Sequence, residues 1–346
     1  MVKERDHAGA ALPDTPHRPS GLDRSQRDFL RSDRARDARY TSAILSSLPV
    51  PLQIGFLVLL FAIGVLSRRA GWLAPAHGGK MLNLVMTVGL PALFISDVSR
   101  MTLSRDVLVL PAIAAAVMLL TGAAAAVIGR LWQVPRASFG SLVICSMAIN
   151  NGLLFPFVIA GWGSQAFARL ALFDLGNAIM QCTFIYAIAA LYGGNSATPA
   201  AIARRVFTFP PLWGLAVALA INLSGYQLPP LVTQVLGTGG RLILLLVVLA
   251  LGILFDTRLA RSRLVVAAIG LRIGLGFLLG LAAVKILGLE GLVAHVVLLG
   301  CAAPIGFNVV VIANREHLDR ELAASAASIS VLAALIYVPL TLLLVR

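Results

Sequence analysis

Residues 146–163 read SMAINNGLLFPFVIAGWG and residues 298–315 read LLGCAAPIGFNVVVIANR, and these two apolar stretches share an unusual spacing. Each has a glycine four residues before a proline: Gly152 with Pro156, and Gly300 with Pro304. A proline inside a helix cannot donate to the carbonyl four residues earlier, and its ring displaces that carbonyl. Here the displaced carbonyl belongs to a glycine, which tolerates the distortion. The spacing predicts two interrupted helices, each made of two half-helices.

The composition of the whole chain indicates a membrane protein. Of its 346 residues, 59% are hydrophobic and 12% are charged, and the mean hydropathy is +0.90. Soluble domains carry about 25% charged residues, so we expect lipid to surround most of this chain. Ten apolar stretches are long enough to cross a hydrocarbon core of about 30 Å as helices. They cover residues 50–66, 81–97, 107–129, 139–162, 170–192, 210–228, 235–255, 264–287, 292–314 and 322–345.

The polar segments set the expected orientation. Residues 1–47 mix Arg with Asp and three prolines, which predicts a disordered tail. The loops that follow odd-numbered spans hold more than twice as many Lys and Arg residues as the loops that follow even-numbered spans. By the positive-inside rule the odd-numbered loops are cytoplasmic. We therefore expect a multi-pass protein of the cytoplasmic membrane with both termini extracytoplasmic.

The two glycine–proline stretches occupy the fourth and ninth of the ten spans. Five spans in each half place similar halves in opposite orientations, as in many secondary transporters. We predict an all-α membrane protein with ten transmembrane helices in two inverted five-helix repeats, in which broken helices 4 and 9 cross. The predicted parts are the tail (1–47), the first repeat (48–193), a cytoplasmic linker (194–209) and the second repeat (210–346). The plainer alternative is that each kink only adjusts helix packing.

Crossing helix breaks predict a site for an anion. The amides at the start of each second half-helix point positive charge toward the gap, and free carbonyls at the end of each first half-helix remain for a cation or for hydrogen bonds. An Asn side chain can donate to a carboxylate without a buried charge. Alternatively, each Asn only bonds a neighbouring helix. The substrate-binding candidates around the breaks are Asn150, Asn151, Gly152, Pro156, Gly300, Pro304 and Asn308.

A polar stripe marks the fifth span. Asp174, Asn177 and Gln181 are spaced i, i+3 and i+7, so they share one helix face. We expect this face to turn inward, with Asn177 and Gln181 in the substrate site. A carboxyl that titrates while exposed to alternate sides can carry a proton, so Asp174 is the coupling-ion candidate. The alternative is an interfacial aspartate that pairs with Arg169 at the helix end.

Arg272 lies deep in the eighth span, where an unpaired charge is costly. It is predicted to meet water, an acid or the substrate, as a possible substrate counterion, although lining a vestibule or pairing structurally are equal alternatives. Gly270 and Gly274 lie on another side of the same helix and form a small-residue face expected to contact a neighbouring helix closely.

Several classes of function lack support in the sequence. The three cysteines lie in apolar runs without metal-ligand spacing, no HExxH motif is present, and the dispersed Lys and Arg residues do not form a nucleic-acid surface. We therefore predict no metal, no cofactor and no nucleic-acid partner. An intramembrane enzyme would need a catalytic pair in the bilayer, and only one acid is well embedded, so we predict no enzyme. A GxxxxGK[ST] loop for ATP is also missing.

The chain resembles the auxin efflux carrier family over about residues 50–346. The resemblance rests on INNGLLFPFVIAGWG (149–163), ARLALFDLGNAIMQCTFIYAIAALYG (168–193) and AAPIGFNVVVIANREHLDRELAASAASISVLAAL (302–335), with GLPALF (89–94) and LALGILF (249–255) as weaker support. It implies the inverted ten-helix fold with crossing fourth and ninth helices, and substrates such as malonate, malate or auxin. The chain departs from the family pattern at Phe155, which replaces a glycine in a segment one residue shorter.

These observations predict a secondary active transporter of a small organic anion, a mono- or dicarboxylate, that works by alternating access. A passive anion channel and a membrane sensor with the same fold are the open alternatives. The expected partners are the anion, a coupling proton or sodium ion and membrane lipid, with a homodimer as a further option.

Overall fold

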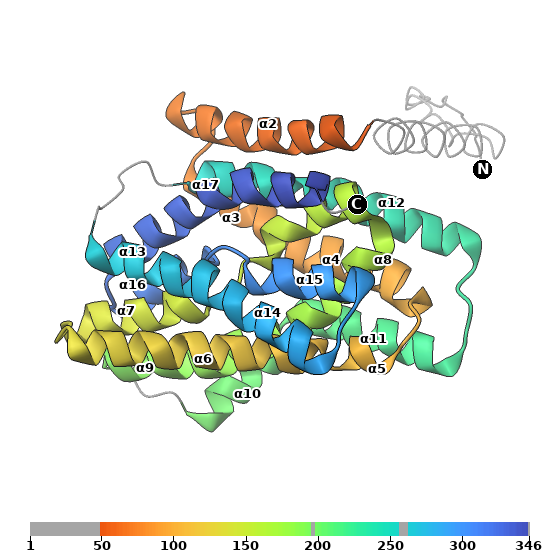
Figure 1. Cartoon of the computed structure of the whole chain (residues 1–346). Helices are drawn as coiled ribbons and strands as arrows, with labels where there is room; N and C mark the ends of the chain where they lie inside the picture. The colour runs from red at the N-terminus through yellow and green to blue at the C-terminus, as the bar shows by residue number, and fades with distance from the viewer. Residues whose placement is uncertain (1–48, 195–197, 256–261, 345–346) are drawn as a thin grey trace, which may run out of the picture. The chain divides into compact units, whose positions relative to one another are not determined.

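The computed structural model describes residues 49–194, 198–255 and 262–344, and within these ranges every regular element is a helix. The predicted tail, residues 1–47, lies outside the described residues. Figure 1 shows the arrangement. The helices up to the first interruption are α2 (Val50–Arg69), α3 (Pro75–Leu84), α4 (Leu90–Asp97), α5 (Arg105–Leu108), α6 (Leu110–Leu131) and α7 (Arg136–Met147). Between the two interruptions lie α8 (Asn151–Met180), α9 (Tyr186–Gly193), α10 (Pro199–Phe207), α11 (Pro210–Ser224), α12 (Pro230–Leu254), α13 (Arg263–Ile269), α14 (Gly276–Leu287) and α15 (Gly291–Cys301).

The second interruption is followed by α16 (Asn308–Arg315) and α17 (Arg320–Leu344). Four short turns of π- or 3₁₀-helix continue the α-helices: η1 (Val85–Gly89), η2 (Val98–Arg100), η3 (Gln181–Ile185) and η4 (Gly270–Leu275). The predicted all-α class is thus confirmed for the described residues.

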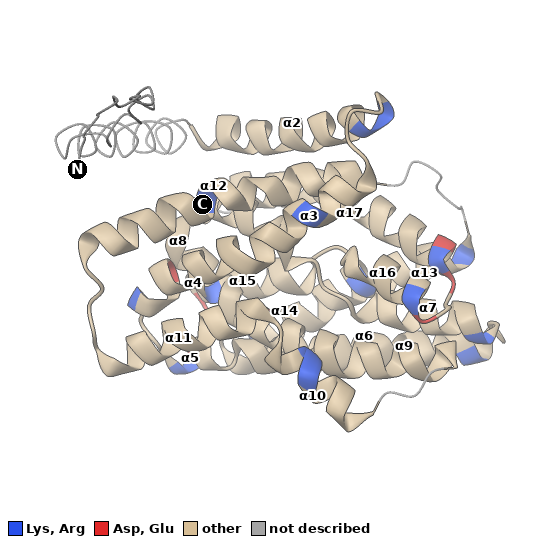
Figure 2. Ribbon diagram, turned by 180° about the vertical axis from the view of Figure 1, so that it is seen from behind, with Lys and Arg blue, Asp and Glu red and all other residues tan. Residues whose placement is uncertain are grey.

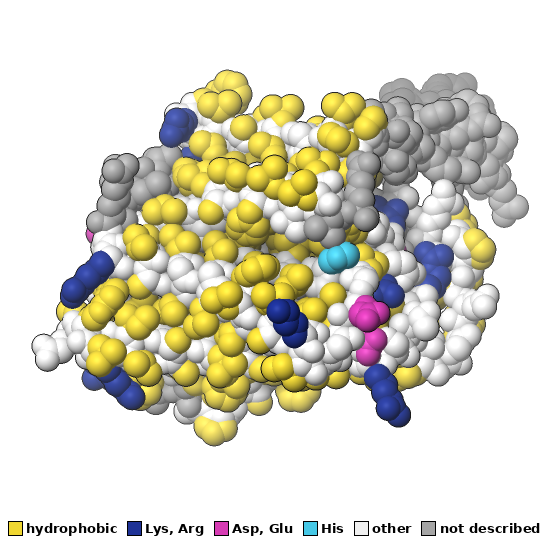
Figure 3. Space-filling view, in the orientation of Figure 1, with side chains coloured by type: hydrophobic (Ala, Val, Ile, Leu, Met, Phe, Trp, Pro, Cys, Tyr) yellow, Lys and Arg dark blue, Asp and Glu magenta, His cyan; other side chains and the backbone are white. Residues whose placement is uncertain are grey.

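The helices have the length and hydropathy of membrane spans. Among the described residues, seven helical stretches qualify, or eight if α10 and α11, bent by 58°, are counted together. The number ten remains a prediction. One qualifying stretch, Asn151–Gly193, runs through parts of predicted spans four and five, whereas predicted span nine is divided into the shorter α15 and α16. Figure 3 shows a face dominated by hydrophobic side chains, as expected where lipid replaces water.

The described helices pack in two groups. In the first group α12 packs along α2, α3 and α4, and α11 packs against α4. In the second group α6 packs against α7 and α8, α15 against α8 and α14, and α17 against α13 and α16. Both groups combine helices from the two halves of the sequence, so the predicted repeat boundaries remain a prediction.

The first interruption precedes the segment from Gly152 to Pro156, where the glycine–proline spacing predicts it. α7 ends at Met147, Ala148 is extended (φ −67°, ψ 122°), and α8 begins at Asn151. Asn150 caps α8, because its Oδ1 accepts the N–H of Leu153 at 3.2 Å. The prediction of a break between Gly152 and Pro156 is therefore wrong in position. Pro156 removes one hydrogen bond near the start of α8, and the helix begins where an asparagine can cap it.

The second interruption matches the sequence prediction. α15 ends at Cys301 and α16 begins at Asn308, so Pro304 lies in the non-helical segment 302–307. Gly300 lies in the last turn of α15. A further break occurs inside α8, where Gly163 adopts φ 78° and ψ −173°. A positive φ of this kind suits glycine, and it separates the parts of α8 that correspond to predicted spans four and five.

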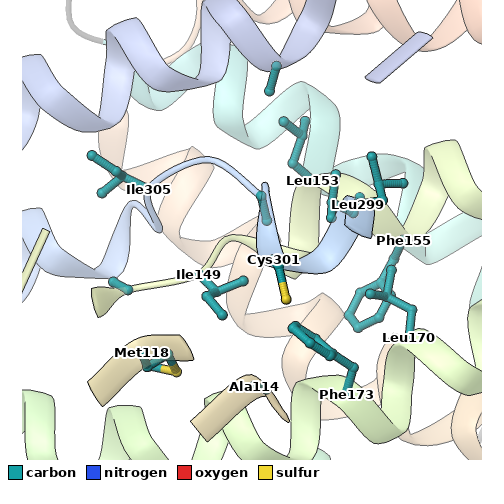
Figure 4. Close-up of a cluster of buried hydrophobic side chains, with 14 of the residues drawn as sticks. Ala114, Met118, Ile149, Leu153, Phe155, Leu170, Phe173, Leu299, Cys301 and Ile305 are labelled. Atoms are coloured by element: carbon teal, nitrogen blue, oxygen red, sulfur yellow. The ribbon is translucent and has the colours of Figure 1, made fainter. Parts of the chain in front are cut away.

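The two interruptions cross each other and are joined through their backbones. Ile149 and Ile305 form an antiparallel bridge, in which the Asn150 N–H donates to the Pro304 carbonyl at 2.9 Å and the Gly306 N–H donates to the Ala148 carbonyl at 3.4 Å. Figure 4 shows both isoleucines among buried hydrophobic side chains. The crossing satisfies backbone groups that each broken helix leaves unpaired.

Candidate functional site

A cavity of about 560 Å³ lies beside the crossing. The first group of helices contributes an apolar wall that includes Leu90, Val247 and Leu251. The opposite wall comes from the interruptions and from the polar stripe of the fifth predicted span. Seven of the predicted site residues line this cavity: Asn150, Asn151, Gly152, Asp174, Asn177, Gln181 and Asn308.

A chain of polar side chains runs along the cavity wall. Asp174 Oδ1 accepts from Asn151 Nδ2 at 2.8 Å and from Asn177 Nδ2 at 2.7 Å. Asn177 Oδ1 accepts from Gln181 Nε2 at 2.9 Å, and Gln181 Oε1 accepts from Asn308 Nδ2. The chain therefore connects the first residue of α8 with the first residue of α16. Arg169, the alternative partner of Asp174, instead donates to both oxygens of Gln165.

The polar stripe also supports the backbone of the first interruption. The Ile149 carbonyl accepts from Asn177 Nδ2 at 3.4 Å and from Gln181 Nε2 at 3.3 Å. These amides replace the helical hydrogen bond that the break removes, because a buried carbonyl left without a donor is costly. The polar stripe that the helical spacing predicts thus supplies hydrogen-bond donors to the first interruption.

The cavity receives the amino-terminal ends of two half-helices. Asn151 and Gly152 at the start of α8, and Phe307 and Asn308 at the start of α16, all line it. Helix starts carry partial positive charge from unpaired N–H groups. No described side chain caps α16, and the N–H groups of Val309 and Val310 in its first turn donate to the Gly306 and Phe307 carbonyls. The arrangement favours a negatively charged group in the cavity.

Two polar atoms next to the cavity have no partner within the described residues. Asn150 Nδ2 and Asn151 Oδ1 are both buried and form no hydrogen bond there, and these residues are 8% and 1% exposed. Buried amide groups without a partner are rare in proteins. A ligand oxygen can accept from Asn150 Nδ2, and a hydroxyl or a protonated carboxyl can donate to Asn151 Oδ1.

Two arginines that the sequence interpretation assigned only to loops line the cavity. Arg68, near the end of α2, donates Nη1 to the Ile253 carbonyl at 3.2 Å and also to the Phe255 carbonyl. Arg320 opens α17, is exposed, and makes no hydrogen bond or ion pair within the described residues. In the sequence, these two arginines could not be distinguished from the other arginines that lie beside apolar stretches. Only the packing of α2 and α17 brings them to the cavity.

Four predicted site residues do not line the cavity: Pro156, Gly300, Pro304 and Arg272. Pro156 is buried inside α8, and Pro304 contributes its carbonyl to the crossing. Gly300 allows close packing, since a Cβ there would lie 2.8 Å from the Phe173 ring. Arg272 bonds backbone carbonyls instead. Arg272 therefore cannot contact a substrate in this cavity directly, as its predicted role of substrate counterion requires.

The small-residue face of the eighth span differs from the prediction. A Cβ added at Gly270 or Gly274 would meet nothing within 4 Å, so these glycines do not form the expected helix contact. Gly276 and Gly280 make the contact instead, with added Cβ atoms 2.3 Å from the Cys301 carbonyl oxygen and 2.7 Å from the Cys301 Cβ. The turn of π-helix in η4 changes the helix phase between the two pairs.

Comparisons with known proteins agree on the class of protein. The sequence model of the family described as "Membrane transport protein" matches residues 199–342. A protein of Methanothermobacter thermautotrophicus described as an "Uncharacterized transporter" is 25% identical over 293 residues, which cover 82% of this chain and 94% of that relative. Both matches are described as transport proteins, and the apolar helices of this chain agree with a membrane protein of that class.

Proposed function

We propose that this protein is a secondary active carrier of a small organic anion, a mono- or dicarboxylate. The single observation that carries the proposal is the cavity at the crossing, where two helix starts converge beside Asn150 Nδ2, which has no partner among the described residues. Their partial charges and donors complement a carboxylate. The arginines Arg68 and Arg320 add positive charge to the same cavity. Among the described residues that line it, Asp174 is the only acidic one.

The two helix groups support alternating access as the mechanism. The cavity has walls from both groups, so a movement of one group against the other changes which end is open. It reaches Arg68, Phe209 and Arg320, which adjoin loops expected to be cytoplasmic. The basic ends of α2, α7 and α13 lie on the same side in Figure 2. We propose two inverted five-helix repeats as the origin of these groups.

The opposite end of the groups is tied by a polar contact. Arg241 on α12 donates Nη2 to Ser164 Oγ on α8 at 2.7 Å and lies 3.8 Å from Asp97 Oδ1 on α4. These residues adjoin loops that we expect to be extracytoplasmic. The described conformation is then open toward the cytoplasm and closed toward the outside.

Asp174 is our candidate for proton coupling. Its Oδ1 already accepts two amide hydrogen bonds beside the cavity, so a change in its charge alters the same network that binds Asn151 and Asn177. Such a carboxyl can gain or lose a proton as access alternates.

Uptake by proteoliposomes tests the site. The full chain is first screened for thermal stabilisation by malonate, malate, acetate, aromatic acids and amino acids, because a ligand of the folded state raises its apparent stability. Uptake of the labelled best ligand is then measured for the parent, Asn151→Ala, Asn308→Ala and Asn314→Ala. Asn314 is exposed on the same short helix as Asn308 but does not line the cavity, so it is the matched control.

We expect Asn151→Ala and Asn308→Ala to lower kcat/KM about tenfold, equivalent to about 1.4 kcal/mol, while Asn314→Ala transports like the parent. Equal uptake by all four proteins would show that the site assignment is wrong. Unlabelled anion on the far side should accelerate exchange of labelled anion. The absence of such counterflow, with flux that does not saturate, would indicate a channel.

A further inference from the structure

Arg272 stands out because its side chain is fully buried and because no acidic residue in the described part of the chain pairs with it. It is 0% exposed, in the π-helical turn η4 in the middle of the eighth predicted span. Within the described ranges, the ion pairs are Arg241 with Asp97 and Arg315 with Glu316, and neither involves Arg272. An unpaired charge inside a membrane is unfavourable, so other groups must stabilise it.

The groups that stabilise Arg272 are three backbone carbonyls at the two helix breaks. Nε donates to the Ala303 carbonyl at 3.3 Å, Nη1 to the Met147 carbonyl at 3.5 Å, and Nη2 to the Cys301 carbonyl. Met147 is the last residue of α7 and Cys301 the last residue of α15. One guanidinium therefore joins the carboxyl-terminal ends of both first half-helices.

The charges at this junction balance. The carboxyl-terminal end of a helix carries about −0.5 elementary charge, so two such ends present about −1. A single guanidinium carries +1 and offers several donors in a fixed plane. The starts of α8 and α16, at the opposite ends of the breaks, face the cavity, where Asp174 accepts from Asn151 at the start of α8. Arg272 thus neutralises the negative ends and leaves the positive ends to the substrate.

The surroundings of Arg272 are shaped to admit it. A Cβ at Gly276 would lie 2.3 Å from the Cys301 carbonyl oxygen and 2.8 Å from Arg272 Nη2, so a glycine is required one turn after the arginine. Tyr337 on α17 donates its hydroxyl to the Ala302 carbonyl. The successive carbonyls of residues 301, 302 and 303 therefore all have side-chain donors.

We propose that Arg272 is a built-in cation that holds the two broken helices together, and that it takes the place of a bound metal cation at the crossing. Arg272 is a positioning residue, because it acts on the substrate through the half-helices and not by contact. The effect of Arg272 on a substrate rests on the proposed carrier function. The junction that Arg272 forms between the helices can be tested without measuring transport. It predicts that no sodium ion binds among these carbonyls.

The test compares thermal unfolding of the purified full chain for the parent, Arg272→Ala, Arg272→Lys, Arg272→Met and Tyr337→Phe. Each protein is measured with a few millimolar guanidinium chloride or with the same concentration of potassium chloride. The guanidinium ion can occupy the space that the Arg272→Ala substitution leaves empty. Tyr337→Phe removes a donor to the same break without opening that space, so it controls for general loss of hydrogen bonding.

We expect Arg272→Ala to unfold at a lower temperature and to recover several degrees with guanidinium, whereas the parent and Tyr337→Phe do not respond. Arg272→Lys should be more stable than Arg272→Met, because only lysine keeps the charge on a side chain of similar length. If Arg272→Ala does not fold, the comparison of Arg272→Lys with Arg272→Met tests the proposal. Equal stability of these two variants, or no selective response of a folded Arg272→Ala to guanidinium, would overturn the proposal.

Sodium provides the second arm. The parent should unfold at the same temperature in sodium, potassium and choline chloride, and its uptake of anion should not change among them. Stabilisation specific to sodium would contradict a junction already filled by Arg272. The unfolding measurements contain no organic anion, so a failure to detect transport would reject the carrier function while leaving this result unaffected.

Discussion

The N–H of Asn150 donates to the carbonyl of Pro304 at 2.9 Å, so the two broken helices are joined through their backbones at the cavity wall. Asn150 also caps α8 through its side chain, and in the described part of the chain its Nδ2 has no partner beside the cavity. Asn150 thus caps the start of a half-helix, takes part in the crossing and presents a free donor within the described residues. Small changes at the crossing should therefore alter both stability and transport.

Gly306→Ala tests the close approach at the crossing. A Cβ at this position would lie 2.4 Å from Asn308 Oδ1 and 3.3 Å from the Ile149 carbonyl oxygen. Such overpacking costs about 1–3 kcal/mol, so we expect a lower unfolding temperature and weaker binding of the anion identified by thermal shift. Gly274→Ala, where nothing lies within 4 Å, is the control and should not lose stability. Equal behaviour of the two variants would argue against a tight crossing.

Asp174→Asn tests proton coupling. The asparagine Oδ1 can still accept from Asn151 and Asn177, so the hydrogen bonds to Asp174 Oδ1 are retained while the titrating group is lost. We expect exchange of anion across the membrane to continue while an imposed pH gradient no longer drives accumulation. Both are measured in proteoliposomes.

Asp106→Asn is the control for this change, because Asp106 is exposed and does not line the cavity. It should accumulate anion like the parent. If Asp174→Asn still follows the pH gradient, another group carries the proton or none does.

Arg320→Gln tests the contribution of the cavity arginines. Arg320 has no partner within the described residues, so its removal breaks no structural contact there. We expect KM for the anion to rise about threefold to tenfold with little change in kcat, since a solvent-exposed charge mainly adds uniform attraction. The difference from the parent should shrink as ionic strength rises.

Arg130→Gln changes an exposed arginine at the end of α6 that does not line the cavity. It should leave KM unchanged. A fall in kcat at constant KM for Arg320→Gln would place this arginine in the conformational change and not in anion attraction.

Local patterns in the sequence determined the helical class, the existence of two interrupted spans and the inward polar stripe. Hydropathy indicates lipid as solvent, prolines disrupt helices at short range, and the i, i+3, i+7 spacing of Asp174, Asn177 and Gln181 sets one face of a helix. None of these requires knowledge of distant contacts. The predicted number and repeat symmetry of the spans go beyond what such patterns decide.

Only the tertiary structure decided where the first break lies, what Arg272 does and which arginines reach the cavity. The break at residues 148–150 is fixed by hydrogen bonds to residues 304 and 306, and Arg272 is stabilised by carbonyls of α7 and α15. Arg68 and Arg320 meet at the cavity because α2 and α17 pack beside α8. In each case the deciding partner is remote in sequence, and short-range spacing carries no information about it.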